Sequence, residues 1–134
     1  MFSIFETELN MQSDYGNHHG SNYAKFFNLI AYVRHNQLEK NYGVSVDSIT
    51  ERGYTLYIST AHINFIREPE EGEDIIIKTQ IDNFSGGTFN VNFWVHTKNN
   101  RRLVADGYFV YSLKFTKNDL PDHFPDDLVA KLSI

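Results

Sequence analysis

The feature that most constrains the fold is a change of hydrophobic periodicity near Gly43. Ahead of it, apolar and aromatic residues recur at spacings of three and four, which predicts a helix of about 20 residues between Ser21 and Gly43. Beyond it, residues 54–66, 74–82, 88–97 and 102–115 are rich in β-branched and aromatic side chains and favour strands. With a further strand over residues 2–12, the chain is predicted to be α+β, one long helix wrapped by an antiparallel sheet.

The same periodicities predict which side chains are buried. The strand at 88–97 alternates, with Phe89 and Val91 among the inward residues and Asn90, Asn92, Trp94 and His96 opposite. Short connections such as "FSGG" and "KNNRR" favour an antiparallel meander, and "REPEEGED" is expected to join the first pair of strands. One helix face is predicted to carry Tyr23, Phe26, Phe27, Ile30, Arg34 and Leu38. A short helix with Asp126 and Asp127 in its first turn is expected near the end.

Composition excludes several functional classes. The chain has 134 residues and no cysteine, so one domain over residues 1–134 is expected, without disulfides or thiolate chemistry. The formal net charge is −5 and no basic block occurs, so we expect no nucleic-acid partner. The start of the chain lacks the pattern of a signal peptide, and no apolar run is long enough for a membrane helix. A cytoplasmic protein without membrane partner, metal or cofactor is expected.

The stretch "SDYGNHHGSNYAKFF" (13–27) places an acid, adjacent histidines and two glycines directly ahead of the helix. One interpretation is a turn in which Asp14 caps the helix. The other is a reaction site, because a helix N-terminus presents free N–H groups and the positive end of the helix dipole. His18 and His19 are not expected to form a metal site, because adjacent residues rarely chelate one ion.

These motifs and their order carry a resemblance. A strand, a glycine-containing loop, a long helix and several strands resemble the hotdog fold, and the local residues resemble its 4-hydroxybenzoyl-CoA thioesterase-like branch. Gly16 and Tyr23 have the spacing of that branch's loop glycine and helix tyrosine, and "GNHHGSNY" is similar to the pattern of thioesterases from enediyne polyketide pathways. The later strands resemble those of the family through Phe65, Pro69, Gly72, Asp74, Ala105 and Gly107.

The resemblance implies an acyl-thioesterase that releases a free acid from coenzyme A or an acyl-carrier protein. Gly20 would supply the oxyanion donor, Asp14 would be the general base, and Asn17 or His18 would orient water. The family's acid lies three residues before the loop glycine, where this chain has Ser13, with Asp14 one position later. A histidine is the alternative base. A non-catalytic acyl-binding module remains open, as does a hotdog dehydratase, although "HFP" (123–125) lies after the last strand rather than ahead of the helix.

The resemblance also implies how substrate is held. In the family the site lies between two subunits, so a homodimer or a dimer of dimers is expected. His62 and Asn64 share a strand face and would either reach the partner's loop or form a polar subunit contact. An acyl chain is expected along the helix, lined by Phe26, Phe27 and Trp94, while Arg34 is interpreted as a snorkelling or interface residue. The residues assigned to substrate binding are Ser13, His19, Tyr23, Phe27, His62 and Asn64.

Overall fold

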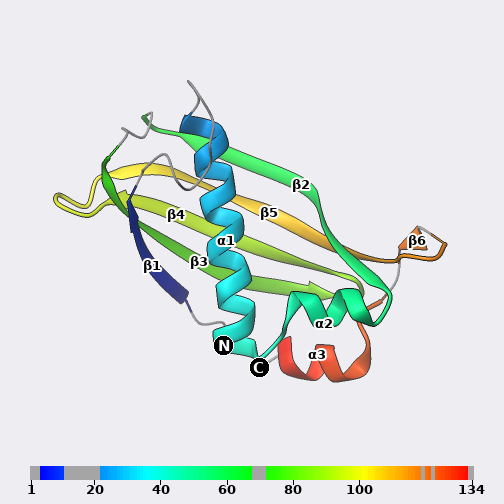
Figure 1. Cartoon of the computed structure of the whole chain (residues 1–134). Helices are drawn as coiled ribbons and strands as arrows, with labels where there is room; N and C mark the ends of the chain where they lie inside the picture. Colours follow the sequence, from blue (N-terminus) through cyan, green and yellow to red (C-terminus); the bar gives the residue numbers. More distant parts are fainter. Residues whose placement is uncertain (1–3, 11–21, 68–71, 119, 122, 133–134) are drawn as a thin grey trace.

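The computed structural model describes residues 4–10, 22–67, 72–118, 120–121 and 123–132, and only the backbone of residues 22–27, 41, 83–84, 120–121 and 132. Figure 1 shows the order of the helices and strands along the chain. The elements are β1 (Ile4–Asn10), α1 (Asn22–Tyr42), α2 (Val46–Glu51), β2 (Tyr54–Phe65), β3 (Asp74–Ser85), β4 (Thr88–Thr97), β5 (Leu103–Phe115), β6 (Leu120–Pro121) and α3 (Asp126–Leu132).

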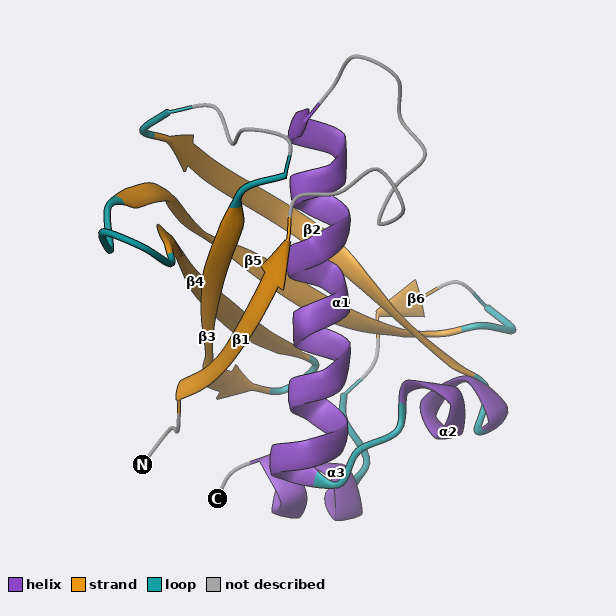
Figure 2. Ribbon diagram, turned by 60° about the vertical axis from the view of Figure 1, so that its left-hand side comes forward, coloured by secondary structure: helices purple, strands orange, loops and turns teal. Residues whose placement is uncertain are grey.

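The described strands form one antiparallel, six-stranded sheet in the order β1-β3-β4-β5-β2, with β6 paired to β5. The sheet curves around α1, which runs across one of its faces (Figure 2). This confirms the predicted α+β architecture of a long helix wrapped by an antiparallel sheet. In both ribbon views α1 begins at the end of the sheet where β2 finishes.

The expected meander is right for β3, β4 and β5 but wrong for β2. Strand β2 pairs with β5 from Tyr54 to Phe65, and β3 pairs with β1 instead. Residues 66–73 therefore connect opposite sides of the sheet rather than forming a hairpin. They must cross three strand spacings of about 4.8 Å each, which is well within the reach of such a segment. Sequence proximity favours neighbours in a sheet, but a connection of this length does not require them.

The core lies between α1 and the middle of the sheet. On β4, the inward residues Phe89, Val91, Phe93 and Val95 are at most 1% exposed, as their alternation predicted. On α1, burial falls on Leu29, Ile30, Val33, Gln37 and Leu38. The predicted helix stripe is thus right at Ile30 and Leu38, whereas Arg34 lies at its margin and is only partly buried.

A polar pair anchors α1 to the sheet. Gln37 and Thr79 are both fully buried, and the Gln37 side chain bonds to both the side chain and the backbone of Thr79. The Thr79 hydroxyl donates to Gln37 Oε1 at 2.6 Å, and Gln37 Nε2 donates to the Thr79 carbonyl at 3.3 Å. Because a buried polar group without a partner is costly, this pair fixes both the rotation and the position of α1 on β3.

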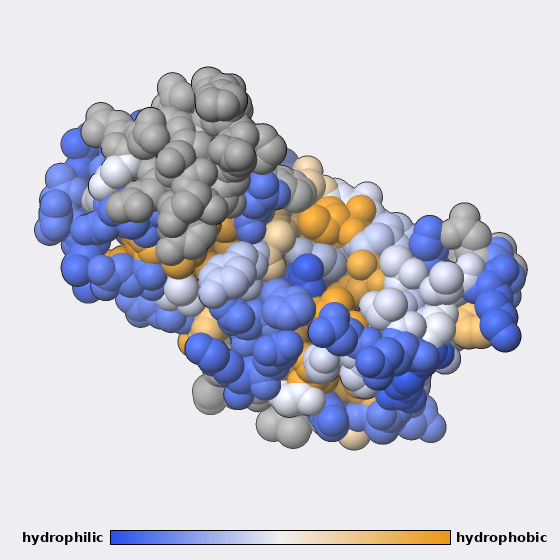
Figure 3. All heavy atoms as spheres, in the orientation of Figure 1, coloured by the Kyte–Doolittle hydropathy of each residue, from blue (hydrophilic) through white to orange (hydrophobic). Residues whose placement is uncertain are grey.

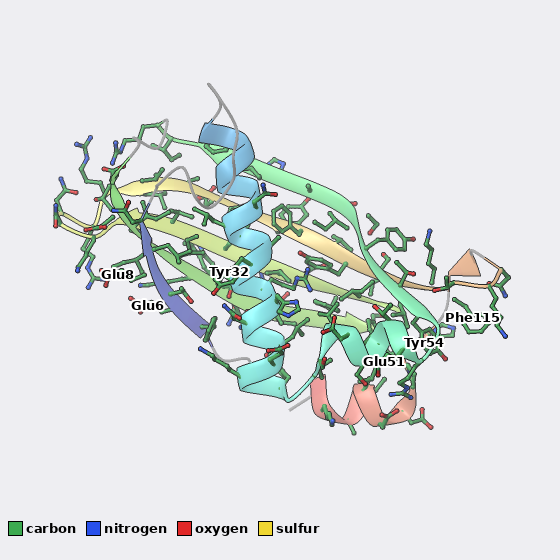
Figure 4. The ribbon with its side chains drawn as sticks, in the orientation of Figure 1. Glu6, Glu8, Tyr32, Glu51, Tyr54 and Phe115 are labelled. Carbon is green, nitrogen blue, oxygen red and sulfur yellow. The ribbon has the colours of Figure 1, made fainter. Side chains whose placement is uncertain are left out.

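The end of the sheet away from the start of α1 is closed by two short helices. The Ser45 hydroxyl accepts from the Ser48 backbone N–H at the start of α2. Arg52, which ends α2, forms two hydrogen bonds with Asp127 in the first turn of α3, at 2.8 and 3.0 Å. The rings of Tyr54 and Phe115 pack beside them with centroids 5.6 Å apart (Figure 4). The sequence did not predict α2, because six residues are too few for a helical period.

Strands β2 and β5 approach so closely at Gly107 that no side chain fits there. A Cβ atom at this position would lie 2.0 Å from the His62 carbonyl oxygen and 2.9 Å from the Phe93 ring. The glycine that contributed to the family resemblance therefore has a steric reason. It sits where the edge strand β2 joins the rest of the sheet.

Replacing Gln37 with Leu, or Thr79 with Val, is expected to lower the free energy of unfolding by about 1–3 kcal/mol, because each leaves the other buried group unpaired. The double variant should recover part of the loss, because both partners are then apolar. Urea unfolding of the wild type, both single variants and the double variant measures this coupling. Strictly additive losses would show that the two side chains do not interact.

Substituting Gly107 with Ala is expected to lower the free energy of unfolding by about 2–3 kcal/mol, because β2 must move away from β5. Gly72→Ala is the matched control, since Gly72 has φ +83° but a Cβ added there would meet no atom within 4 Å. That control should show only backbone strain, about 1–2 kcal/mol. Equal losses in urea unfolding would contradict the steric explanation.

Candidate functional site

The predicted reaction loop lies outside the described residues. Ser13, Asp14, Asn17, His18, His19 and Gly20 all belong to this segment, and their roles remain predictions. Tyr23 and Phe27 belong to the first two turns of α1, but their side chains are likewise not described. The structure does show the two elements that flank this segment: β1, which ends at Asn10, and α1, which begins at Asn22.

The start of the loop is tied to the beginning of β3. The Asn10 side-chain amide donates to the Gly72 carbonyl at 2.9 Å and to an Asp74 carboxylate oxygen at 2.6 Å. Gly72 has φ +83°, which favours glycine, and Asp74 begins β3. These two residues of the family pattern therefore act structurally. They hold the last described residue ahead of the loop against the sheet.

His62 and Asn64 share a strand face, as predicted, and that face points away from α1. The His62 ring stacks on Tyr108 of β5, with centroids 5.4 Å apart. The Asn64 amide donates to the Asp106 carboxylate at 3.3 Å. Both side chains are exposed on the outer face of β2, the strand that ends the sheet. This position suits contact with another molecule rather than with the inner face of the same chain.

Trp94 cannot line an acyl tunnel along α1. It alternates with the buried residues Phe93 and Val95 and therefore lies on the outer face of β4. In register it stands between Lys78 of β3 and Asp106 of β5. The expectation that Trp94 lines such a tunnel is wrong, because strand alternation puts it on the side of the sheet opposite to the helix.

The inner face of the sheet is covered unevenly. Inward residues of β3, β4 and β5 such as Ile77, Phe93 and Phe109 are fully buried. The inward residues of β2, which we call the β2 strip, are only partly buried or exposed. Helix α1 lies closest to β3, β1 and α2, which leaves this side less covered. Apolar surface is visible between α1 and β2 in Figure 3. The β2 strip consists of Leu56, Ile58, Ala61, Ile63 and Phe65.

Arg34 lies beside the β2 strip on the core side of α1. Its guanidinium carbon stands 4.5 Å from the ring centroid of Tyr111, which pairs in register with Ile58 of β2. The Nε and Nη1 atoms of Arg34 are buried and have no hydrogen-bond partner within the described part of the chain, and the same holds for the Tyr111 hydroxyl. Burial raises the pKa of Tyr111, while the Arg34 side chain opposes that rise through its charge and through its polar contact with the phenol, so the phenol stays protonated near neutral pH.

The stacking on Tyr111 does not compensate for these unpaired groups. A cation–π contact contributes about 0.5–2 kcal/mol. Each buried donor without a partner costs about 1–3 kcal/mol, and two nitrogens of Arg34 are in this state. The sequence placed Arg34 on the helix stripe but gave no sign of Tyr111, which is far away in the chain. The one signal in the sequence was a charged residue, Arg34, at a position where the helical spacing predicts a buried apolar residue.

Metal binding finds no support among the described side chains. They contain no group of three or more histidines, cysteines, aspartates and glutamates close enough to hold an ion. No described helix is both long and apolar enough to cross a bilayer.

Comparison with known proteins identifies the family. Residues 10–132 match the model of the thioesterase-like superfamily, and the chain belongs to that family. No curated protein sequence is significantly similar to it.

Solved structures share its fold. A 1,4-dihydroxy-2-naphthoyl-CoA thioesterase from Synechocystis has a TM-score of 0.82 and 14% identity, covering 98% of this chain and 99% of that one. A hypothetical protein from Staphylococcus aureus, in complex with CoA, has a TM-score of 0.79 and 15% identity, covering 99% and 84%. A 12:0-ACP thioesterase from Umbellularia californica has a TM-score of 0.78 and 13% identity, covering 97% and 49%. The common fold is the hotdog fold, as the resemblance implied.

His96, on the outer face of β4, is expected to make the protein less stable as the pH falls. Burial lowers its pKa below the usual 6.5, and the charges of Lys78 and Arg101 lower it further, while Glu6 opposes them. The unfolded chain therefore binds the proton first, so this contribution is complete above about pH 6.5 and is lost as pH falls through the folded pKa. His96→Gln should flatten this part of the profile in urea unfolding between about pH 5 and 8. Parallel profiles for the two proteins would contradict the assignment.

Proposed function

We propose that this chain is an acyl-thioesterase that hydrolyses an acyl-CoA or acyl-carrier-protein thioester to the free acid. The observation that carries this proposal is the family match over residues 10–132, together with a loop that enters α1 from an anchored strand end. The CoA-bound Staphylococcus aureus protein and the plant 12:0-ACP thioesterase of the same fold make both thiol carriers candidates.

In the proposed reaction, the thioester carbonyl lies at the N-terminus of α1. The Gly20 amide stabilises negative charge on the carbonyl oxygen, aided by the helix dipole. Asp14 removes a proton from water, which Asn17 or His18 orients, and the water oxygen attacks the carbonyl carbon. The carbon–sulfur bond then breaks, and the thiol leaves with a proton. Ser13, His19 and Tyr23 contact the substrate around this centre.

The acyl group is proposed to lie between α1 and the β2 strip, with Phe27 near its thioester end. Two facts support this placement. The β2 strip is apolar yet only partly buried, and it runs toward the end of the sheet where α1 begins. Burying such apolar surface against an acyl chain is favourable. The other faces of the helix are either packed on β3 or, as at Tyr32, directed to the exposed side (Figure 4).

A homodimer or a dimer of dimers is proposed to complete the site. Strand β2 is the last strand in the described order of the sheet and spans 12 residues, Tyr54–Phe65, so the sheet ends on a long strand. Natural proteins pair, cover or block such edges. A second copy aligned on β2 would bring His62 and Asn64 within reach of the partner's loop. Sedimentation of a strictly monomeric species at micromolar protein would contradict this arrangement.

One sequence feature favours a second candidate, a non-catalytic acyl-thioester binding module. Ser13 stands where the related enzymes carry an acid. A binding module would retain the fold and the apolar space beside α1 without turnover. Activity measurement separates the two functions directly.

Thiol release from short, long and aromatic acyl-CoAs is expected for the wild-type protein. Asp14→Ala should lower the rate about 10²–10⁴-fold, because it removes the general base. Glu51→Ala is the matched control and should retain full activity, since Glu51 is exposed on α2 at the opposite end of the sheet from the start of α1 (Figure 4). Turnover that survives in Asp14→Ala would remove Asp14 from the mechanism and favour a histidine. Binding of acyl-CoA without turnover would favour the binding module.

A further inference from the structure

Arg34 and Tyr111 place buried hydrogen-bonding atoms under α1. Arg34 Nε and Nη1 and the Tyr111 hydroxyl have no hydrogen-bond partner among the described residues. No described carboxylate forms an ion pair with Arg34. The rings of Phe89 and Phe109 pack against Tyr111, so its surroundings are apolar. A guanidinium and a phenol hydroxyl that can both donate, with no described carboxylate paired to the guanidinium, are complementary to a carboxylate.

The donors lie on the side of the core that opens toward the β2 strip. Tyr111 pairs with Ile58, a member of the strip that is only partly buried. Arg34 is itself partly exposed, although two of its nitrogens are not. A ligand that enters between α1 and β2 therefore reaches the guanidinium without disturbing the helix anchor, because Gln37 and Thr79 contact each other on β3.

Arg34 is too far along α1 to contact a thioester held at the helix N-terminus. From Asn22 to Arg34 the helix rises about 18 Å. Helical side chains lean toward the N-terminus, so the guanidinium stands roughly 12 Å from that end. An extended chain advances about 1.2 Å per bond, so an acyl group of about ten carbons spans this separation. The guanidinium thus meets the far end of an acyl group and not its carbonyl.

We propose that Arg34 and Tyr111 bind a carboxylate at the far end of the acyl group, which makes this protein selective for ω-carboxyacyl thioesters of medium length. The inference rests on the proposed thioesterase function and names its substrate class. Arg34 forms the ion pair, and the Tyr111 hydroxyl donates a further hydrogen bond to the same carboxylate. The methylene chain between the two ends covers the β2 strip.

The test compares two CoA thioesters of equal length, decanoyl-CoA and the monothioester of decanedioic acid, with the wild type and Arg34→Met. The wild type should have a kcat/KM about tenfold or more higher for the carboxylated substrate, because donors built for a polar group discriminate strongly against its absence. Arg34→Met should lose about 100-fold on that substrate and less than about threefold on decanoyl-CoA. Tyr111→Phe should lose about threefold to tenfold on the carboxylated substrate alone.

Two controls separate recognition from general effects. Lys40→Met removes the same charge from an exposed position in the last turn of α1 and should leave the preference intact. Thermal unfolding of Arg34→Met should show no marked loss of stability, because the variant removes two buried nitrogens that have no hydrogen-bond partner among the described residues. Equal losses on both substrates, or a marked drop in melting temperature, would make Arg34 a structural residue and overturn the proposal.

Calorimetric binding of free decanedioate and decanoate keeps the inference separate from the proposed function. If no thioester is hydrolysed but decanedioate binds in an Arg34-dependent manner, the thioesterase proposal is wrong and the carboxylate site stands. If hydrolysis occurs while both substrates react alike and both acids bind alike, the protein is a thioesterase and the carboxylate site is wrong.

Discussion

The reciprocal hydrogen bonds between Gln37 and Thr79 decide where α1 lies on the sheet. Both side chains are fully buried, so neither can exchange its partner for water without a large cost. With α1 held over β3, the middle of the sheet is covered and β2 is left partly open. The apolar β2 strip and the partly exposed Arg34 are consequences of this placement. The position of the helix therefore determines both the core and the space proposed for the acyl group.

The two ends of the sheet also differ in what lies over them. At one end α2 and α3 cover the sheet, joined by the Arg52–Asp127 pair and the packed rings of Tyr54 and Phe115. At the other end α1 begins, β2 finishes and Asn10 is tied to the start of β3. One end is thus closed by packed helices, while the other holds the N-terminus of α1, the place at which the reaction site is proposed. This division is what a site at the start of α1 requires.

Much of the fold was predictable from local pattern. The bounds of β4 and the burial of its alternate residues were predicted because period-two alternation reports directly on a half-buried strand. The bounds of α1 followed from spacing and from Gly43, which has φ +65° after its last residue. The candidate site was less predictable. Its loop residues were assigned through resemblance, Trp94 was assigned to the acyl tunnel although its alternation placed it opposite the inward residues, and Arg34 was not connected with Tyr111.

The sequence by itself determined which residues of β4 face inward, where the long helix begins and ends, and that a polar stretch precedes it. Tertiary structure alone decided that β2 pairs with β5, that Gln37 meets Thr79 from 42 positions away, and that Arg34 lies over Tyr111. The physical reason is that periodicity specifies the face that a side chain occupies, whereas its partner depends on contacts between distant segments. Those contacts form only when the whole core packs, because close packing selects one arrangement among many with the same pattern.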